Sequence, residues 1–166
     1  MFVLTKVTAT VAHLNTRLEK HGEEDVLAAD IKFTTDVPNT FLDKLSPGLL
    51  VSLYRHEGET PGEQLGIDSE HRPVLRYPQI DAIKWDGKIE AAEVVLHGKN
   101  KAENTVLEAN VTKLHLVCKE GGTVTATFLL QMLVDSTLVA QWSELLGKSV
   151  KLSVIPPLGP DTPPVE

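Results

Sequence analysis

Apolar and polar positions alternate most regularly between residues 106 and 134. Over residues 123–134 every even-numbered position is apolar, whereas most odd-numbered positions are threonine or glutamine. This period of two is typical of a β-strand with one buried face. Gly121-Gly122 separates two such runs, so the stretch predicts a long hairpin whose even-numbered face lies in the core. Leu129 and Leu133 fall on the other face, and we expect the helix that follows to cover them.

A second hairpin is predicted at the N-terminal end of the chain. Apolar residues and threonines alternate up to Val11, after which the apolar phase shifts by one residue toward Leu14. A shift of this kind inside a strand indicates a bulge or bend. Gly22 lies at the centre of a charged turn, and the return strand alternates cleanly from Leu27 to Thr34.

Two short helical segments are predicted after this hairpin. Asn39 or Thr40 can cap the first segment, which contains residues 41–45. Ser46-Pro47 has the form of an N-cap followed by proline at the first helical position, and residues 49–54 carry leucines and a tyrosine at helical spacing. The two segments form either a kinked pair or one broken helix.

The middle of the chain is less regular. From Arg55 to Pro78, glycine and proline interrupt a polar stretch, which predicts a long loop of a kind that is often functional. Strand-like character returns from Ile80 to His97. Within it, Asp86-Gly87 is a hairpin-turn dipeptide between two short apolar runs.

The last helix and strand complete a single predicted domain. Either residue of Asp135-Ser136 can cap an amphipathic helix that ends at Gly147, and Val150 to Val154 alternates like a strand. Five of the ten prolines fall within residues 156–166, which predicts an extended or disordered tail. We therefore predict an α+β, β-rich domain over residues 1–155, mainly an antiparallel sandwich or open barrel with two or three short helices.

The composition limits the classes of function. The chain has 166 residues, of which 42% are hydrophobic and 23% charged, as in ordinary globular proteins. Its net charge of −7 disfavours a general phosphate-binding surface. A single cysteine, Cys118, excludes an intramolecular disulfide and a thiolate zinc site, and we expect it to act as a small buried hydrophobe. We find no signal peptide and no long apolar segment, which predicts a cytoplasmic protein without a membrane span.

Motifs for catalysis, cofactors or metals are missing from the sequence. The six histidines form no H-x-x-H, H-E-x-x-H or H-x-H pair, and the acidic turn at Glu23–Asp25 lacks the ligand ladder of a calcium loop. The glycines form no phosphate-binding loop and no nucleophile elbow. We therefore expect a non-enzymatic protein with no catalytic residue, cofactor or metal; an enzyme would need a site assembled from scattered residues.

One segment, residues 71–88, combines basic and aromatic side chains. Four cations and two aspartates give it a net charge of +2, so the rest of the chain carries −9. A protein interface uses such side chains as anchors, and single-stranded nucleic acid binds them through stacking and phosphate pairing. Alternatively, the tryptophan is part of the core and the cations line a solvated strand edge. The candidate interaction surface consists of Arg72, Arg76, Tyr77, Lys84, Trp85 and Lys88.

Three passages carry a resemblance. Residues 18–33 read LEKHGEEDVLAADIKF, residues 46–54 read SPGLLVSLY and residues 120–125 read EGGTVT. Together they resemble uncharacterised small accessory proteins of temperate bacteriophages of Proteobacteria, over most of the chain up to about Pro157. The resemblance implies a phage origin, expression in the cytoplasm of the bacterial host and an accessory role. It supplies no catalytic motif.

These observations lead to one main functional hypothesis and several alternatives. We expect a non-enzymatic phage accessory protein that binds a host or phage protein, for example a counter-defence inhibitor or a regulator. The alternatives are a single-stranded nucleic-acid-binding accessory protein of phage replication or recombination, acting through residues 71–88, and a virion structural component. Assembly into a homo-oligomer and sequestration of a small molecule in the mouth of the fold also stay open.

Overall fold

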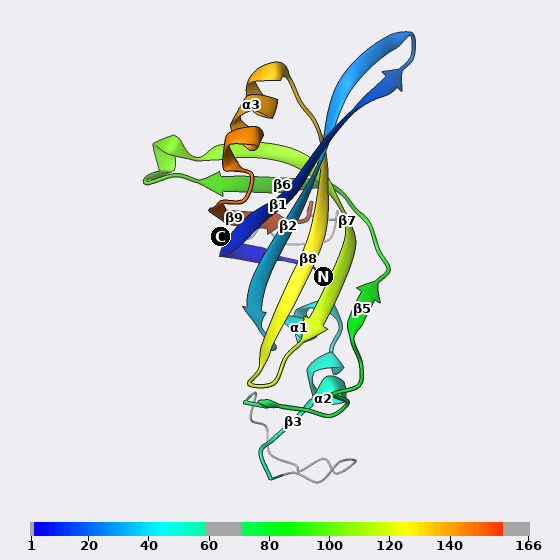
Figure 1. Cartoon of the computed structure of the whole chain (residues 1–166), viewed down its shortest axis with the longest axis vertical. Coiled ribbons are helices and arrows are strands. Elements are labelled where there is room, and N and C mark those ends of the chain that lie inside the picture. Colours follow the sequence, from blue (N-terminus) through cyan, green and yellow to red (C-terminus); the bar gives the residue numbers. More distant parts are fainter. Residues whose placement is uncertain (1, 59–70, 158–166) are drawn as a thin grey trace.

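Six long alternating segments form a closed antiparallel barrel in the computed structural model, which describes residues 2–58 and 71–157 (Figure 1). Around the barrel the strand order is β7-β6-β9-β1-β2-β8, and β8 pairs again with β7. The predicted β-rich class is confirmed, but the expected sandwich or open barrel is wrong, because β7 is paired on both edges and closes the sheet. The six strands are β1 (Leu4–His21), β2 (Glu24–Pro38), β6 (Ile89–His97), β7 (Thr105–Cys118), β8 (Thr123–Leu133) and β9 (Ser149–Ile155).

Both predicted long hairpins are confirmed. Gly22 turns β1 into β2 with a φ of 69°, and Gly121 and Gly122 turn β7 into β8 with φ values of 94° and 93°. These positive φ values are readily adopted only by glycine, which explains why the turns fall where they do. The predicted phase shift in β1 is also present, because the register with β2 slips between Val11 and His13.

Three further bulges fall at residues other than glycine. Lys6, Ala91 and Lys113 have φ values of 47°, 54° and 53°, and each lies inside a register shift, in β1, β6 and β7 respectively. A bulge bends its strand and increases the local twist, which a sheet of only six strands needs in order to close. All three side chains point into solvent. Because their sequence looks like ordinary strand, these bends were not predicted.

The interior of the barrel is filled by side chains from the inward-facing positions. On β8 all five even-numbered residues from Val124 to Met132 are buried, as the alternation predicted. Phe33 of β2 stacks on Phe128 with ring centroids 5.6 Å apart, and Phe2 meets Phe128 edge-on at 5.2 Å. Aromatic pairs in these geometries add about 0.5–1.5 kcal/mol beyond the burial of their area. The central channel is therefore a packed core.

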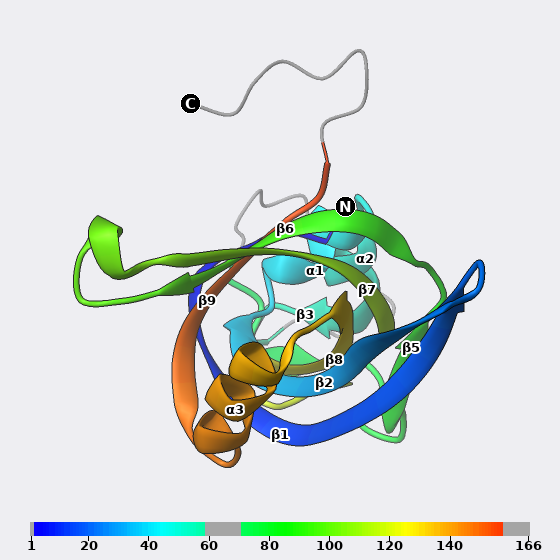
Figure 2. The ribbon, with the colours of Figure 1, turned by 90° about the horizontal axis from the view of Figure 1, so that it is seen from above.

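Helices lie at both ends of the barrel: the view along its axis shows α3 (Ser136–Leu145) over one side of the near opening, with α1 (Phe41–Leu45) and α2 (Leu49–Leu53) at the far end (Figure 2). The near helix, α3, turns Trp142 inward against Phe33 at 5.7 Å. The predicted capping of α3 is confirmed, since the Asp135 carboxylate accepts a hydrogen bond from the amide of Leu138 at 2.8 Å. Beyond its C-terminal end, the amide of Gly147 donates to the carbonyl of Val11 at 2.8 Å, which ties the helix to β1.

At the far end, α1 and α2 are two separate helices. The predicted N-cap at Ser46-Pro47 is wrong, because Ser46 ends α1 and Gly48, with a φ of 88°, precedes α2. The carboxylate of Asp43 instead reaches across and accepts a hydrogen bond from the amide of Leu50 at 3.0 Å. A side chain of the first helix thus satisfies an amide of the second, a tertiary contact that local sequence does not reveal.

Two other expectations are corrected. Asp86-Gly87 does not form a hairpin, because β5 (Ala82–Trp85) and β6 lie end to end along the same edge of β7. The expected cover of Leu133 by the last helix is also wrong: this side chain is 52% exposed, and α3 instead packs Trp142 against Phe33.

The predicted loop from Arg55 to Pro78 contains a small second sheet. It consists of β3 (Tyr54–Arg55) and β4 (Val74–Leu75), two antiparallel strands of two residues each. Within the predicted tail, all but Pro156 and Pro157 lies outside the described residues, as do residues 59–70 of the loop. None of the described helices is long and apolar enough to cross a membrane.

We expect Trp142→Ala to lower the free energy of unfolding by about 3–5 kcal/mol, because it empties the space that the indole fills against Phe33. Urea denaturation followed by circular dichroism measures the change. Leu146→Ala is the matched control, since this exposed leucine just beyond α3 contributes little, and its change should stay within about 0.5 kcal/mol. An equal loss of unfolding free energy in the two variants would contradict the assignment of Trp142 as a core residue of the barrel.

Candidate functional site

The six residues of the candidate interaction surface separate into distinct environments. Arg72 is only 7% exposed and lies at the end of the barrel near the β7–β8 turn. Its carbonyl accepts a hydrogen bond from the side chain of Asn39 at 2.7 Å, which anchors the segment that leads into β4. Lys88 directly precedes β6, and its ammonium group pairs with Glu90 at 3.2 Å. These two cations therefore do not share one surface.

Arg76 is a structural anchor of the same segment. Its side-chain Nε donates to the carbonyl of Val51 at 2.7 Å, and its amide donates to the carbonyl of Leu53 at 2.9 Å. Both acceptors belong to α2. The chain is thereby held against α2 directly before the following turn, so the turn leaves the barrel at a fixed place.

The turn itself exposes two large apolar side chains. The amide of Ile80 donates to the carbonyl of Tyr77 at 3.0 Å, which closes the turn. Tyr77 is 55% exposed and Ile80 is 46% exposed. Two neighbouring exposed apolar residues on a turn that is anchored at both ends form a preorganised contact surface, because little chain entropy remains to be lost on binding.

The turn leads directly into β5, which is an edge strand. β5 pairs with β7 alone among the described strands, so its other edge presents unpaired backbone groups (Figure 1). Lys84 points into solvent, whereas Ile83 and Trp85 pack against the core. We name the turn Tyr77–Ile80 together with the outer edge of β5 the edge surface. It contains two of the six predicted residues, Tyr77 and Lys84.

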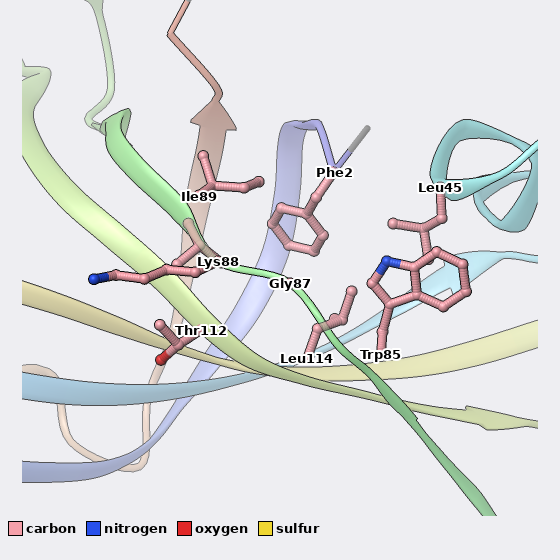
Figure 3. A pocket seen from close by; sticks show the side chains of 9 residues that line it. Phe2, Leu45, Trp85, Gly87, Lys88, Ile89, Thr112 and Leu114 are labelled. Carbon is pink, nitrogen blue, oxygen red and sulfur yellow. The ribbon is translucent and has the colours of Figure 1, made fainter.

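Trp85 belongs to a different feature, an apolar pocket in the wall of the barrel. The pocket has a volume of about 170 Å³ and lies where β5 ends and β6 begins (Figure 3). Trp85 forms one side of it with Leu45 beside the indole ring, and Phe2 lies across from them. Sequence reasoning did not find this pocket, because its walls come from four separate parts of the chain.

Cys118 at the end of β7 packs against the core as expected, but it is half-buried and not fully buried. Burial raises the pKa of its thiol, an effect that a hydrogen bond with Tyr54 partly offsets. Burial also raises the pKa of the Tyr54 phenol well above its usual range, and the phenol donates to the carbonyl of Lys119 at 2.8 Å. A thiol with a raised pKa is protonated at neutral pH and is a weak nucleophile.

A serine–histidine pair on the outer face of the barrel was not predicted. The Ser153 hydroxyl lies 2.6 Å from Nε2 of His97, and the same oxygen accepts a hydrogen bond from the amide of Lys6 at 2.9 Å. Ser153 is buried, so its oxygen joins the bulge at Lys6 in β1 to β6 across β9. The pair is a structural link, and only the register of three strands brings its members together.

Within residues 2–58 and 71–157 no three histidine, cysteine, aspartate or glutamate side chains converge as a metal site would require. Comparisons of the chain with protein-family models, with curated proteins and with solved structures gave no match. The geometry of the edge surface and of the apolar pocket is therefore the basis for a functional proposal.

We expect the stability of the fold to decrease above about pH 9. The ordinary pKa values of Cys118 and Tyr54 are 9.0 and 10.0, and burial raises both in the folded state. The unfolded chain then ionises first, so the stabilisation is complete below pH 9 and is lost as the pH rises toward the folded-state values. Urea unfolding of wild type and Cys118→Ala at pH 7.5, 9 and 10 measures the effect, and the variant should lose less stability. An identical decrease in both proteins would contradict this assignment.

Proposed function

We propose that this protein is a non-enzymatic binding protein, an accessory factor of the kind that temperate phages encode, which engages a host or phage protein through the edge surface. The observation that carries the proposal is the unpaired edge of β5 beside the exposed side chains of Tyr77 and Ile80. A partner strand that added to this edge would form backbone hydrogen bonds, and the two apolar side chains would supply contact area.

The position of the edge favours a specific interface. Natural proteins protect long exposed edges with charged residues, short strands and bulges. β5 has four residues and carries Lys84, so nonspecific pairing is limited. The adjacent Tyr77 and Ile80 are nevertheless exposed, and tyrosine is enriched at the centres of protein interfaces. A protected edge beside exposed apolar side chains therefore supports binding to one specific partner.

The distribution of cations supports a protein partner over a nucleic acid. Affinity for single strands depends on cations that follow the phosphate backbone beside stacking aromatic rings. Arg72 is buried, Arg76 is hydrogen-bonded to α2 and Lys88 is paired with Glu90. Lys84 is the one remaining cation of the predicted patch, and the net charge of the chain is −7.

The proposal predicts that capture of a bacterial partner depends on the edge surface. Immobilised wild-type protein should retain one stoichiometric partner from host lysate, and the double variant Tyr77→Ser/Ile80→Ser should lose at least nine-tenths of it, because both exposed anchors are removed. Quantitative mass spectrometry of the eluates measures the retention.

The matched control for this experiment is Val106→Ser. Val106 is 61% exposed at the start of β7, whereas β5 pairs with residues 114–117 near the other end of that strand, and substitution of Val106 removes a similar apolar side chain. This variant should retain the partner at the wild-type level. Capture that is unaffected by the double variant, or equally reduced by the control, would refute the edge surface as the binding site, and a lysate without any stoichiometric partner would refute the proposed function.

A second prediction separates the proposal from nucleic-acid binding. We expect no retardation of single-stranded oligonucleotides in a gel shift at 50 mM salt, because a single available cation in the patch gives little counterion release. A shift that weakens steeply with salt and is lost in Lys84→Glu would instead favour the nucleic-acid-binding alternative.

A further inference from the structure

The apolar pocket lies at a gap in the barrel wall that the strand pairing itself creates. β9 ends at Ile155, opposite Glu93, so the chain before Glu93 has β7 as its partner on one edge only. Along β5 and β6, four residue steps separate Trp85 from Ile89, whereas three steps separate their partners Leu114 and Val111 on β7. The β5–β6 side thus carries one extra residue here, which makes the wall locally irregular, as at a β-bulge. The pocket is lined by Phe2, Leu45, Trp85, Gly87, Lys88, Ile89, Val111, Thr112 and Leu114.

The pairing also prevents the pocket from collapsing. Trp85 is held opposite Leu114 and Ile89 opposite Val111 by the ladders of β5 and β6 with β7, so the two sides of the opening are fixed independently. An apolar space of this kind is poorly hydrated, and its walls lack the dispersion contacts that a filled core provides. A ligand that supplies these contacts gains affinity without first having to open the site.

We propose that this pocket binds a compact, uncharged compound with one aromatic ring and one hydrogen-bond acceptor. Its volume of about 170 Å³ suits a single substituted ring, since an engineered apolar cavity of about 150 Å³ in another protein binds benzene. The rings of Phe2 and Trp85 both border the space (Figure 3). Their faces and edges offer the stacked and edge-to-face contacts that aromatic rings prefer.

The polar groups around the pocket determine which substituent the ring of the ligand should carry. The indole nitrogen of Trp85 is turned toward Phe2 across the pocket (Figure 3), and it makes no hydrogen bond to another residue of the described part of the chain. An indole N–H is a donor only, so it matches an acceptor such as a carbonyl oxygen. The ammonium group of Lys88 points away from the pocket and pairs with Glu90, so no charge on the ligand is needed.

The two tryptophans of the chain provide a direct test. We use acetophenone, an aromatic ketone, as the probe and record the indole N–H signals of uniformly ¹⁵N-labelled protein by NMR. The Trp85 signal, assigned by its loss in Trp85→Phe, should shift with acetophenone and reach saturation. The Trp142 signal should stay in place, because this side chain is buried at the helix-capped end of the barrel. No saturable shift of the Trp85 signal, or equal shifts of both signals, would overturn the proposal.

Variants then test the pocket and the hydrogen bond separately. Val111→Phe fills the pocket from β7 and should abolish the shift of the Trp85 signal with acetophenone. If that variant does not fold, Leu45→Phe fills the pocket from α1 and should have the same effect. Trp85→Phe removes the donor and part of the wall, so it should weaken both ligands, but acetophenone about fivefold more than toluene, which has no acceptor; a factor of five is about 1 kcal/mol. These two ligands are compared through the backbone amide signals of the wall residues. Retention of binding in a folded filling variant would overturn the proposal.

The inference is independent of the proposed partner. Trp85 packs inward from β5, whereas Tyr77 and Ile80 are exposed on the turn before it. Tyr77→Ser/Ile80→Ser should therefore bind acetophenone like wild type even where it has lost its protein partner. Loss of acetophenone binding in this folded double variant would contradict the separation of the two sites.

Discussion

The pairing of β9 between β1 and β6 is the interaction on which the rest of the structure depends. The N-terminal hairpin already pairs with β8 through β2, and β9 joins its other edge, β1, to β6; without β9 the sheet would have two open edges. Its length is equally important. Because β9 ends at Ile155, it pairs with β6 and closes the barrel there, but it does not reach β5, which keeps a free edge. The closed core and the open edge are consequences of the same seven-residue strand.

Bends in the strands make this closure possible. Lys6, Ala91 and Lys113 adopt positive φ values that cost about 1–2 kcal/mol each for residues other than glycine. The tertiary structure compensates for these costs, for example where Ser153 accepts the amide of Lys6 and Asn110 accepts the amide of Ala91. At these two bulges the backbone amide is thus bonded to a side chain of a neighbouring strand.

A filled interior restricts where this barrel can act. Larger barrels hold ligands in a central cavity, but here phenylalanines from β2, β8 and the N-terminal segment occupy the centre, and helices lie at both ends. What remains is the outer wall, where β5 presents an edge to solvent and its last residue, Trp85, borders a pocket. The two proposed sites are therefore adjacent along β5, but the edge surface involves side chains that point outward, whereas the pocket involves Trp85, which points inward.

The sequence by itself determined the elements whose signals are local. Alternation from Val124 to Met132, glycine at turns and the Asp135 cap identified both hairpins and α3, because periodicity and capping depend on neighbouring residues. The tertiary structure alone decided barrel closure, the end-to-end arrangement of β5 and β6, and the separation of Arg72 from Lys84. These features depend on which strand edges meet, and edge pairing is made by backbone groups that are the same in nearly every residue.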